Sequence, residues 1–461
     1  MSGLFYKLKE GVILRGWLDL PLAISNQVTG QTFSISKEQF DLLSVCDGKT
    51  NIENSNLNAL INTLKSKNVI EQCKEGQNIA EEQKFKFYNC RYIKKVDWSI
   101  TGRCNYLCKH CFVSAPSNRF GELPLSICFD FIDQFAECGI RNVLLTGGEP
   151  LLRKDLLQII DKLISQNICI ETLSTNGSLL TEKLLNEFKA RKLNTTFALS
   201  FDGLGCHDYL RGVPDAEKHF TKAIELLSKY NFPIIVRMTT HSKNLHSIIP
   251  TINFLSQFNL KEFKIGSVIT SGDWRKQPDR DLDIKKLYNV YLNTIDYFIR
   301  NNSPINLHIA GFFCCAKNNT NYVIPNAKFD GSESAKNQFL CKHTKTMLYL
   351  SGDGQLLPCM AVSGMDVKRN NNKKLSLLEN RLYYILAGKE QMKDTGKQLS
   401  YLLKVNKECR VCNYKFFCGG GCRASAASLT GNYYGCDEYM CVFYKNNYAQ
   451  QIANTVQNAI L

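Results

Sequence analysis

Between residues 91 and 305, short apolar segments alternate regularly with longer amphipathic ones. The short segments have the length and composition of buried strands: VDWSIT (96–101), NVLLTG (142–147), ICIETLST (168–175), NTTFALSF (194–201), PIIVRMTT (233–240) and EFKIGSV (262–268). Intervening segments, including 123–139, 154–166, 181–192 and 217–230, carry the apolar period of helices. Six such units predict an α/β fold, a partial (β/α)6 barrel of TIM type, in which ligands lie at the carboxyl ends of the strands.

Residues 1–90 predict a separate small domain. Segment 11–36 contains short strand-like stretches broken by turn residues, and segment 36–48 begins with Ser36 as a helix N-cap. Segment 56–70 repeats the helical period and 68–73 reads as a strand. This order predicts a winged-helix-like domain, followed by a linker at 74–87. Residues 306–461 form the third predicted unit.

Cysteine content bears on both the location and the chemistry of the chain. The 461 residues include 20 cysteines, yet no run of about 18 apolar residues occurs and the first 20 residues lack the pattern of a secretory signal. We therefore expect a cytoplasmic protein without a membrane span. Because cytosolic thiols stay reduced, metal binding explains the cysteines better than disulfides do.

The net charge of +15 does not by itself indicate nucleic acid. The lysines are dispersed along the chain without a dense basic tract. A solvated, Lys-rich surface with some attraction for acidic partners is the simpler interpretation, and we expect no nucleic-acid partner.

Three cysteines directly follow the first predicted strand of the barrel. Cys104, Cys108 and Cys111 lie within eight residues, without a fourth cysteine nearby. Structural zinc sites and ordinary iron-sulfur clusters take four protein ligands, so a trio leaves one coordination position open. Half of a zinc site is the alternative interpretation.

The spacing Cys104-x3-Cys108-x2-Cys111, together with TGGEP after the second strand, resembles the radical S-adenosylmethionine (SAM) superfamily. This resemblance implies that the three thiolates hold a 4Fe-4S cluster whose fourth iron is chelated by SAM. In that family the reduced cluster cleaves SAM to a 5′-deoxyadenosyl radical that abstracts a substrate hydrogen atom. Gly147 and Gly148 would let the backbone approach the methionine moiety, and Glu149 would orient its ammonium group.

The resemblance also suggests further SAM contacts at other strand ends. His110 occupies the position of an aromatic residue whose backbone meets the adenine. Candidates for contacting the ribose or carboxylate are Ser174, Asn176, Ser200, Asp202, Arg211 and Arg237. The alternative is structural, because TNG and FDG are good turn signals in any fold.

A second cysteine system lies in the last third of the chain: Cys341, Gly354-x4-Cys359, Cys409-x2-Cys412-x5-Cys418-x3-Cys422 and Cys441. This pattern resembles the SPASM extension of peptide-modifying radical SAM enzymes. The resemblance implies two auxiliary 4Fe-4S clusters, one held by Cys409, Cys412, Cys418 and Cys441. Cys341, Cys359 and Cys422 would hold the other, with Cys315 or Cys314 as fourth ligand or with an open iron. Cys436 competes with Cys441 for its position. A zinc ribbon would favour two CxxC pairs, and only Cys409–Cys412 has that spacing in this segment.

The N-terminal unit is similar to the precursor-recognition element of ribosomal peptide maturases, which takes up a leader peptide as an added strand. These resemblances together imply a radical SAM/SPASM enzyme that forms a thioether or carbon-carbon crosslink in a ribosomally made peptide. Its partners would be the precursor peptide and a low-potential electron donor such as flavodoxin or ferredoxin. No residue can be named as the substrate base, because many candidates exist and no spacing selects one.

Other functions remain open at this point. A sulfatase-maturating enzyme that makes formylglycine has the same clusters but needs no N-terminal recognition domain. From a different class, the chain could be an iron-sulfur or zinc scaffold without radical chemistry. An RNA-modifying radical SAM enzyme fits the positive charge, but the dispersed lysines and the SPASM-like cysteines count against it.

Overall fold

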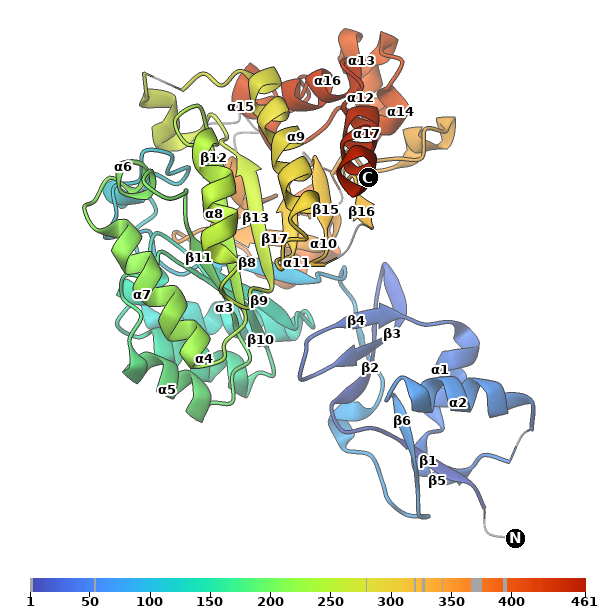
Figure 1. The fold of residues 1–461 in the computed structure, drawn as a ribbon. Coiled ribbons are helices and arrows are strands. Elements are labelled where there is room, and N and C mark those ends of the chain that lie inside the picture. Colours follow the sequence, from blue (N-terminus) through green and yellow to red (C-terminus); the bar gives the residue numbers. More distant parts are fainter. Residues whose placement is uncertain are drawn as a thin grey trace.

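The fold centres on one large, mostly parallel sheet (Figure 1). The computed structural model describes residues 3–53, 55–278, 280–318, 321–325, 328–341, 343–365, 375–392 and 396–461. Within these residues the sheet has the strand order β16-β15-β14-β13-β12-β11-β10-β9-β8-β17-β18. Its strands are β8 (Lys95–Ser99), β9 (Asn142–Thr146), β10 (Cys169–Thr175), β11 (Thr196–Ser200), β12 (Ile234–Thr240), β13 (Glu262–Ser267), β14 (Leu307–Ile309), β15 (Phe313–Cys315), β16 (Tyr322–Val323), β17 (Met347–Leu350) and β18 (Leu356–Leu357).

The six predicted strands correspond to β8–β13, which pair in parallel with their neighbours in chain order. β14 extends this array in parallel at one edge, and β17 pairs in parallel with β8 at the other. β15, β16 and β18 add antiparallel strands outside these. The predicted α/β partial barrel is thus confirmed, and strands from beyond residue 305 complete both of its edges.

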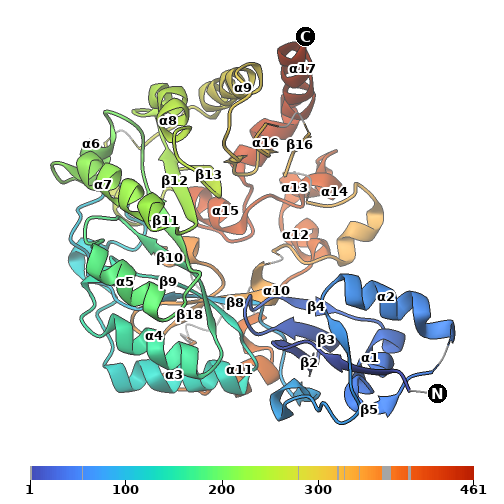
Figure 2. The ribbon, with the colours of Figure 1, turned by 60° about the horizontal axis from the view of Figure 1, so that its bottom comes forward.

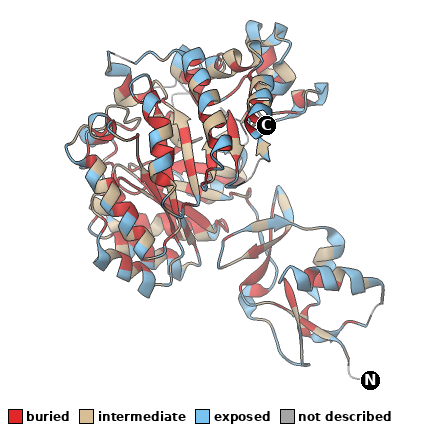
Figure 3. Cartoon of the chain, viewed as in Figure 1, coloured by how far each residue is buried: buried red, intermediate tan, exposed pale blue. Residues whose placement is uncertain are grey.

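Helices cover the outer side of the curved sheet (Figure 2). The covering helices are α3 (Leu125–Glu137), α4 (Leu156–Ser165), α5 (Glu182–Ala190), α6 (His207–Arg211), α7 (Ala216–Lys229), α8 (Ile248–Leu255) and α9 (Ile284–Arg300). Apolar residues from the strands and helices form the main core, which is red in Figure 3 and includes Val143, Leu173, Val236, Ile252 and Phe263.

The C-terminal part of the chain consists mostly of short helices, of which α11 packs against α3 in the outer layer of the barrel (Figure 2). They are α10 (His343–Thr346), α11 (Leu382–Ala387), α12 (Leu399–Val405), α13 (Lys407–Val411), α14 (Lys415–Cys418), α15 (Arg423–Thr430), α16 (Glu438–Lys445) and α17 (Tyr448–Ile460). The long helix α17 packs against α9 and joins this part to the barrel. Short 3-10 turns occur at 55–57, 81–83, 115–117, 150–152, 245–247, 272–276, 333–337, 360–362 and 390–392.

The N-terminal unit lies beside the barrel and has its own small core (Figure 1). It contains a sheet of order β5-β1-β6 and a sheet of order β4-β3-β2-β7. Its elements are β1 (Phe5–Leu8), β2 (Val12–Trp17), β3 (Leu20–Asn26), β4 (Thr32–Ser34), α1 (Lys37–Ser44), β5 (Asp47–Asn51), α2 (Asn58–Ser66), β6 (Ile70–Cys73) and β7 (Lys86–Tyr88). Ser36 caps α1 as predicted and forms a capping box with Gln39.

The predicted linker at 74–87 is wrong in its second half. β7 pairs with β2 in parallel, so these residues belong to the N-terminal sheet. The side chain of Gln83 is buried, and its Nε2 donates to the carbonyl oxygens of Lys9 at 2.8 Å and Val12 at 3.1 Å. Most other polar residues of this segment are exposed, which explains the composition that suggested a linker, while the buried amide of Gln83 binds backbone carbonyls.

Hydrogen bonds anchor the N-terminal unit to the end of the barrel where the strands begin. Trp17 Nε1 donates to the carbonyl oxygen of Cys138 at 2.9 Å, and Asn142 Nδ2 donates to that of Gly30 at 2.7 Å. Both contacts are buried, so the N-terminal unit has a defined position on the barrel. In the described part of the chain, no helix is both long and apolar enough to span a membrane.

Candidate active site and cysteine clusters

The loop between β8 and α3 carries the cysteine trio at the carboxyl end of the sheet. Cys104, Cys108 and Cys111 are half-buried. Burial raises the pKa of Cys104 to about 12 and that of Cys111 to about 11, and their neighbouring thiols add to both shifts. Without a bound cation, these thiols therefore stay protonated at neutral pH.

Polar hydrogens point at all three sulfur atoms. The backbone N–H of Tyr106 donates to Cys104 Sγ at 3.4 Å, and that of Ala115 donates to Cys111 Sγ at 3.3 Å. Arg211 Nη1 lies 3.7 Å from Cys108 Sγ. Donors of this kind stabilise thiolates and tune iron-sulfur clusters, so the loop fits the 4Fe-4S cluster that the family implies.

The described residues include no three His, Cys, Asp or Glu side chains that converge on a single metal ion. A 4Fe-4S cluster does not need such convergence, because each thiolate binds a different iron.

The GGE segment after β9 packs directly against the cysteine loop. The backbone N–H of Gly148 donates to the carbonyl oxygen of Thr101 at 2.9 Å, and that of Glu149 donates to the carbonyl oxygen of Arg103 at 2.8 Å. A Cβ on Gly148 would stand 2.1 Å from the Arg103 carbonyl oxygen, and one on Gly147 would stand 2.5 Å from that of Thr101. These glycines are thus required for contact with the cysteine loop, whatever else approaches them.

Glu149 is buried behind this segment, and backbone and side-chain groups donate to its carboxylate. Its Oε1 accepts from Thr175 Oγ1 at 2.8 Å and from Leu151 N at 3.1 Å, while its Oε2 accepts from Asn176 N at 2.8 Å. Burial raises its pKa to about 7 despite these hydrogen bonds. The carboxylate therefore gains from a nearby positive charge, such as the ammonium group expected from the sequence.

Asn176 links two loops. Its Nδ2 donates to Asn105 Oδ1 at 2.9 Å, and its Oδ1 accepts from the hydroxyl of Ser178 at 2.7 Å. The side chain of Asn176 thus connects the end of β10 to the cysteine loop.

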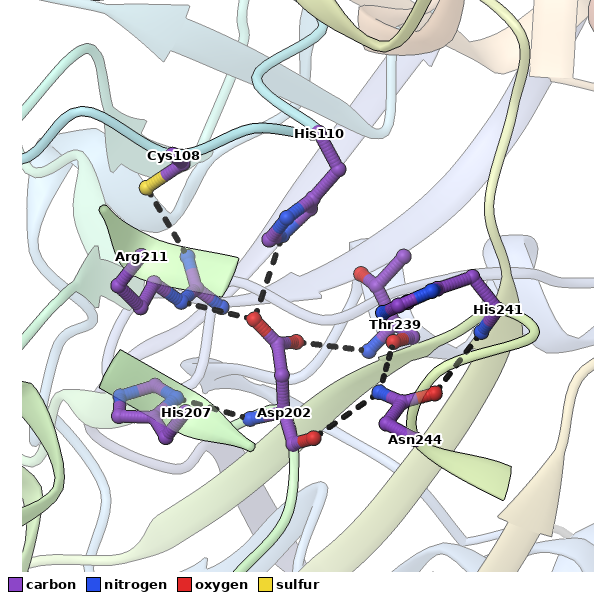
Figure 4. Close-up of polar contacts among 8 residues, drawn as sticks. All are labelled: Cys108, His110, Asp202, His207, Arg211, Thr239, His241 and Asn244. Atoms are coloured by element: carbon purple, nitrogen blue, oxygen red, sulfur yellow. Dashed lines mark hydrogen bonds and ion pairs between the residues drawn. The ribbon is translucent and has the colours of Figure 1, made fainter. Parts of the chain in front are cut away.

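Asp202 is fully buried and organises a polar cluster beside the cysteine loop (Figure 4). Its Oδ2 lies 2.9 Å from Arg211 Nε and 3.4 Å from His110 Nε2, and its Oδ1 accepts from Thr239 N at 3.0 Å. Burial acts to raise the pKa of Asp202, but the positive charge of Arg211 outweighs it, and the pKa is lowered to about 2. Asp202 is therefore ionised at neutral pH and holds Arg211 against Cys108.

Two histidines border this cluster and remain neutral. Burial lowers the pKa of His110 to about 4 and that of His207 to about 3. His207 Nδ1 accepts from Asp202 N at 3.0 Å, which leaves its Nε2 as a buried atom without a partner among the described residues. His110 Nδ1 is likewise a buried atom without a hydrogen-bond partner among the described residues. Sequence reasoning assigned His110 through its backbone and did not predict its side-chain contact with Asp202, which required the fold.

The inner face of the sheet carries three further candidates, Ser174, Ser200 and Arg237. Arg237 Nη1 donates to Ser174 Oγ at 3.3 Å. Ser200 pairs in register with Arg237 across β11 and β12.

Five cysteines line one cavity in the C-terminal part. The cavity has a volume of about 60 Å³, and its lining includes Cys409, Cys412, Cys418, Cys436 and Cys441. Cys409 Sγ lies 3.7 Å from Cys436 Sγ. Both sequence-based candidates for the last ligand, Cys436 and Cys441, therefore reach this cavity.

Cys341, Cys359 and Cys422 form a second group. Burial raises the pKa of Cys359 to about 12, and the neighbouring thiols of Cys422 and Cys341 add to the shift. The side chain of Cys315 does not point toward this group, contrary to its predicted role as the fourth ligand. It lies in the barrel core, with its Sγ 3.5 Å from the carbonyl oxygens of Ala316 and Asn321, because strand alternation turns it away from the face that carries Cys314.

Comparison with known proteins identifies the barrel. Residues 98–255 match the model of the radical SAM superfamily. The AdoMet-dependent heme synthase of Methanosarcina barkeri is 27% identical over 360 residues, covering 76% of this chain and 96% of that protein. The PqqA peptide cyclase of Bradyrhizobium diazoefficiens is 23% identical over 353 residues, covering 72% and 82%.

Solved structures share the fold over more of the chain. Streptococcus suis SuiB bound to its precursor peptide SuiA superposes with a TM-score of 0.63 at 18% sequence identity, covering 95% of this chain and all of that one. The cysteine loop, the GGE segment and the partial barrel agree with the matched family. Residues 98–255 thus form a radical SAM domain, and the protein is a radical SAM enzyme.

Proposed function

We propose that this radical SAM enzyme modifies a ribosomally made precursor peptide and forms a thioether or carbon-carbon crosslink in it. The observation that carries the proposal is the N-terminal unit, a β-rich domain anchored next to the barrel. SuiB, whose fold is similar, was solved with a precursor peptide, and one sequence relative is a peptide cyclase.

The N-terminal unit has features suited to peptide uptake. β4 and β7 are the outer strands of its four-stranded sheet. Phe33 on β4 is 55% exposed and Phe87 on β7 is 47% exposed. An edge strand offers unpaired backbone groups, and exposed aromatic side chains offer apolar contacts, so a leader peptide could bind here as an added strand.

The proposal includes two auxiliary 4Fe-4S clusters. The five-cysteine cavity would hold one of them, with Cys409, Cys412 and Cys418 joined by either Cys436 or Cys441. Cys341, Cys359 and Cys422 would hold the other without Cys315, with either Cys314 as the fourth ligand or one iron left open. In the cytoplasm, a donor such as flavodoxin or ferredoxin would supply the electrons.

When bound, the cluster at the cysteine trio and its SAM supply the radical that removes a hydrogen atom from the substrate. The residues of the chain position and shield these groups. Asp202 keeps Arg211 beside Cys108, the two glycines close the backbone against the cysteine loop, and Glu149 provides negative charge in a buried place.

The test is anaerobic reconstitution of the full-length chain, followed by incubation with SAM, reductant and the short peptide encoded next to its gene. The proposal predicts about 12 irons per chain, four per cluster. It also predicts 5′-deoxyadenosine and a peptide product lighter by two hydrogen atoms in mass spectrometry. SAM cleavage with unchanged peptide, or about 4 irons per chain, would contradict it.

A tetrapyrrole substrate is the second candidate, because the heme synthase relative aligns along 96% of its own length. Offering an iron porphyrin with propionate side chains in the same assay separates the two candidates. Turnover of the porphyrin without turnover of the peptide would favour the second.

A further inference from the structure

One lateral row of residues crosses the inner face of the sheet. Ser200 of β11 pairs in register with Arg237 of β12, and Arg237 pairs with Lys264 of β13. Lys264 pairs in turn with His308 of β14, which pairs with Cys314 of β15. Because registered neighbours on adjacent strands point to the same side, these side chains share one face.

Alternation along the strands shows which face this is. Val236 and Met238 flank Arg237 along β12 and are buried, as are Phe263 and Ile265, which flank Lys264 along β13. These flanking residues belong to the core that packs under the helices. Arg237 is only half-buried and reaches Ser174 on β10 instead. The row therefore faces the interior of the barrel.

Two cations in this row lack a counter-ion. Among the described residues, no carboxylate oxygen lies within 4.0 Å of the charged nitrogens of Arg237 or Lys264. The hydroxyl of Ser174 accepts the hydrogen bond of Arg237. Burial lowers the pKa of both groups, although the more distant carboxylates of Asp97 and Glu262 act in the opposite direction on Arg237 and that of Glu262 does so on Lys264.

The nearest carboxylates already have partners. Glu262 Oε1 lies 3.0 Å from His308 Nδ1, and Asp97 Oδ1 lies 3.7 Å from Lys95 Nζ. The row carries an excess of positive charge inside the barrel.

Like charges directly opposite each other on adjacent strands destabilise a sheet, and so does burial of unpaired charge. A bound anion would relieve both effects. The guanidinium of Arg237 has the planar fork that matches a carboxylate, and the ammonium of Lys264 adds a point charge beside it.

The row lies close to the site of the chemistry. Thr239 is two residues beyond Arg237 on the same face of β12, and its N–H donates to Asp202. Two residues along a strand span about 7 Å, so an anion at Arg237 would lie about one layer of side chains below the Asp202 cluster.

We propose that Arg237 and Lys264 form a carboxylate-binding site inside the barrel, which holds an acidic side chain or the carboxyl terminus of the substrate. The inference rests on the proposed peptide substrate and deepens it, because it assigns a negative charge to the segment that enters the barrel. It also gives Arg237 a role other than the SAM contact expected from the sequence.

The test measures binding of N-acetyl-L-glutamate to the reconstituted full-length protein by calorimetry, with N-acetyl-L-glutamine as the uncharged comparison. Lys264→Met should weaken binding of the glutamate probe by about tenfold or more, the effect expected for a lost charged hydrogen bond. Lys264→Arg should retain most of the affinity. Lys222→Met, which removes an exposed lysine from α7, serves as the matched control and should change nothing.

Three outcomes would overturn the inference: no preference for the glutamate probe over the glutamine probe, a Lys264→Met affinity equal to that of the control, or a parallel loss of SAM affinity. The last would assign the cations to the carboxylate of SAM. The assay does not use the precursor peptide, so probe binding without peptide turnover would refute the proposed function and leave the carboxylate site standing.

Discussion

Replacement of Asp202 by asparagine should destabilise the barrel, because the carboxylate compensates buried positive charge. Asp202 is 0% exposed, and its Oδ2 lies 2.9 Å from Arg211 Nε. The change keeps the size of the side chain and removes its charge. Arg211 would then remain buried without its carboxylate.

The magnitude follows from the pKa. A fall of the pKa of Asp202 from its ordinary value of 3.8 to about 2 corresponds to about 2 kcal/mol of stability at neutral pH. Because the folded pKa is depressed, this contribution is present above pH 3.8 and is lost as the pH falls through 2. Breaking a buried ion pair by removing one partner costs about 3–5 kcal/mol, so we expect a loss between about 2 and 5 kcal/mol.

The assay is native-state hydrogen exchange, read at the amides of β12, since Thr239 N–H donates to Asp202. Asp202→Asn should increase the exchange rate there at pH 7, while α17 provides an internal reference. The double variant with Arg211→Met should lose less than the sum of the single losses, because it removes both charges. Unchanged exchange in β12, or strictly additive losses, would refute the assigned coupling.

Three further predictions concern the cysteine loops and the buried acid. Gly148→Ala should displace the cysteine loop and so lower both the iron bound per chain and the rate of SAM cleavage, because the new Cβ would stand 2.1 Å from the Arg103 carbonyl oxygen. Gly266→Ala is the control, since a Cβ there would have no heavy atom within 4 Å. Equal iron contents in the two variants would contradict the prediction. Cys412→Ser should lower the iron content by about four and spare SAM cleavage while blocking the peptide product, so loss of 5′-deoxyadenosine would argue against two separate clusters. The metal-free protein with Glu149 should lose stability relative to the metal-free Glu149→Gln variant as the pH rises through about 7. The reason is that the raised pKa of Glu149 stabilises the protonated form, whose contribution to stability is complete only below about pH 4.5. A difference in melting temperature between the two proteins that stays flat from pH 5 to 8 would exclude this.

Local patterns predicted the elements of the barrel well. The six apolar segments correspond to β8–β13, and Ser36 caps α1. Both predictions succeeded because the periods of strands and helices, and capping boxes, can be recognised within a few neighbouring residues of the sequence. The cysteine trio with GGEP identified the radical SAM domain for a similar reason, since the loop that surrounds the cluster is built from neighbouring residues. The linker prediction failed at β7, where the pairing partner lies 71 residues earlier in the chain.

Within the site, the sequence could name Asp202, Arg211 and His110 but could not place them around one carboxylate. That arrangement joins the ends of β8, β11 and β12, which only the parallel sheet brings together. Likewise, Cys314 and Cys315 are adjacent in the sequence and equivalent as ligands, and only their strand shows that they face opposite sides.

The sequence by itself determined the radical chemistry, because three thiolates in a short loop and a glycine pair after the next strand make the cluster site nearly a local structure. Tertiary structure decided what surrounds that site. Arg237 and Lys264 became neighbours through the register of β12 and β13, and the edges of the barrel were completed by β14 and β17 from the C-terminal part. Register and edge pairing depend on contacts between residues far apart in the chain, and no short window of sequence carries that information.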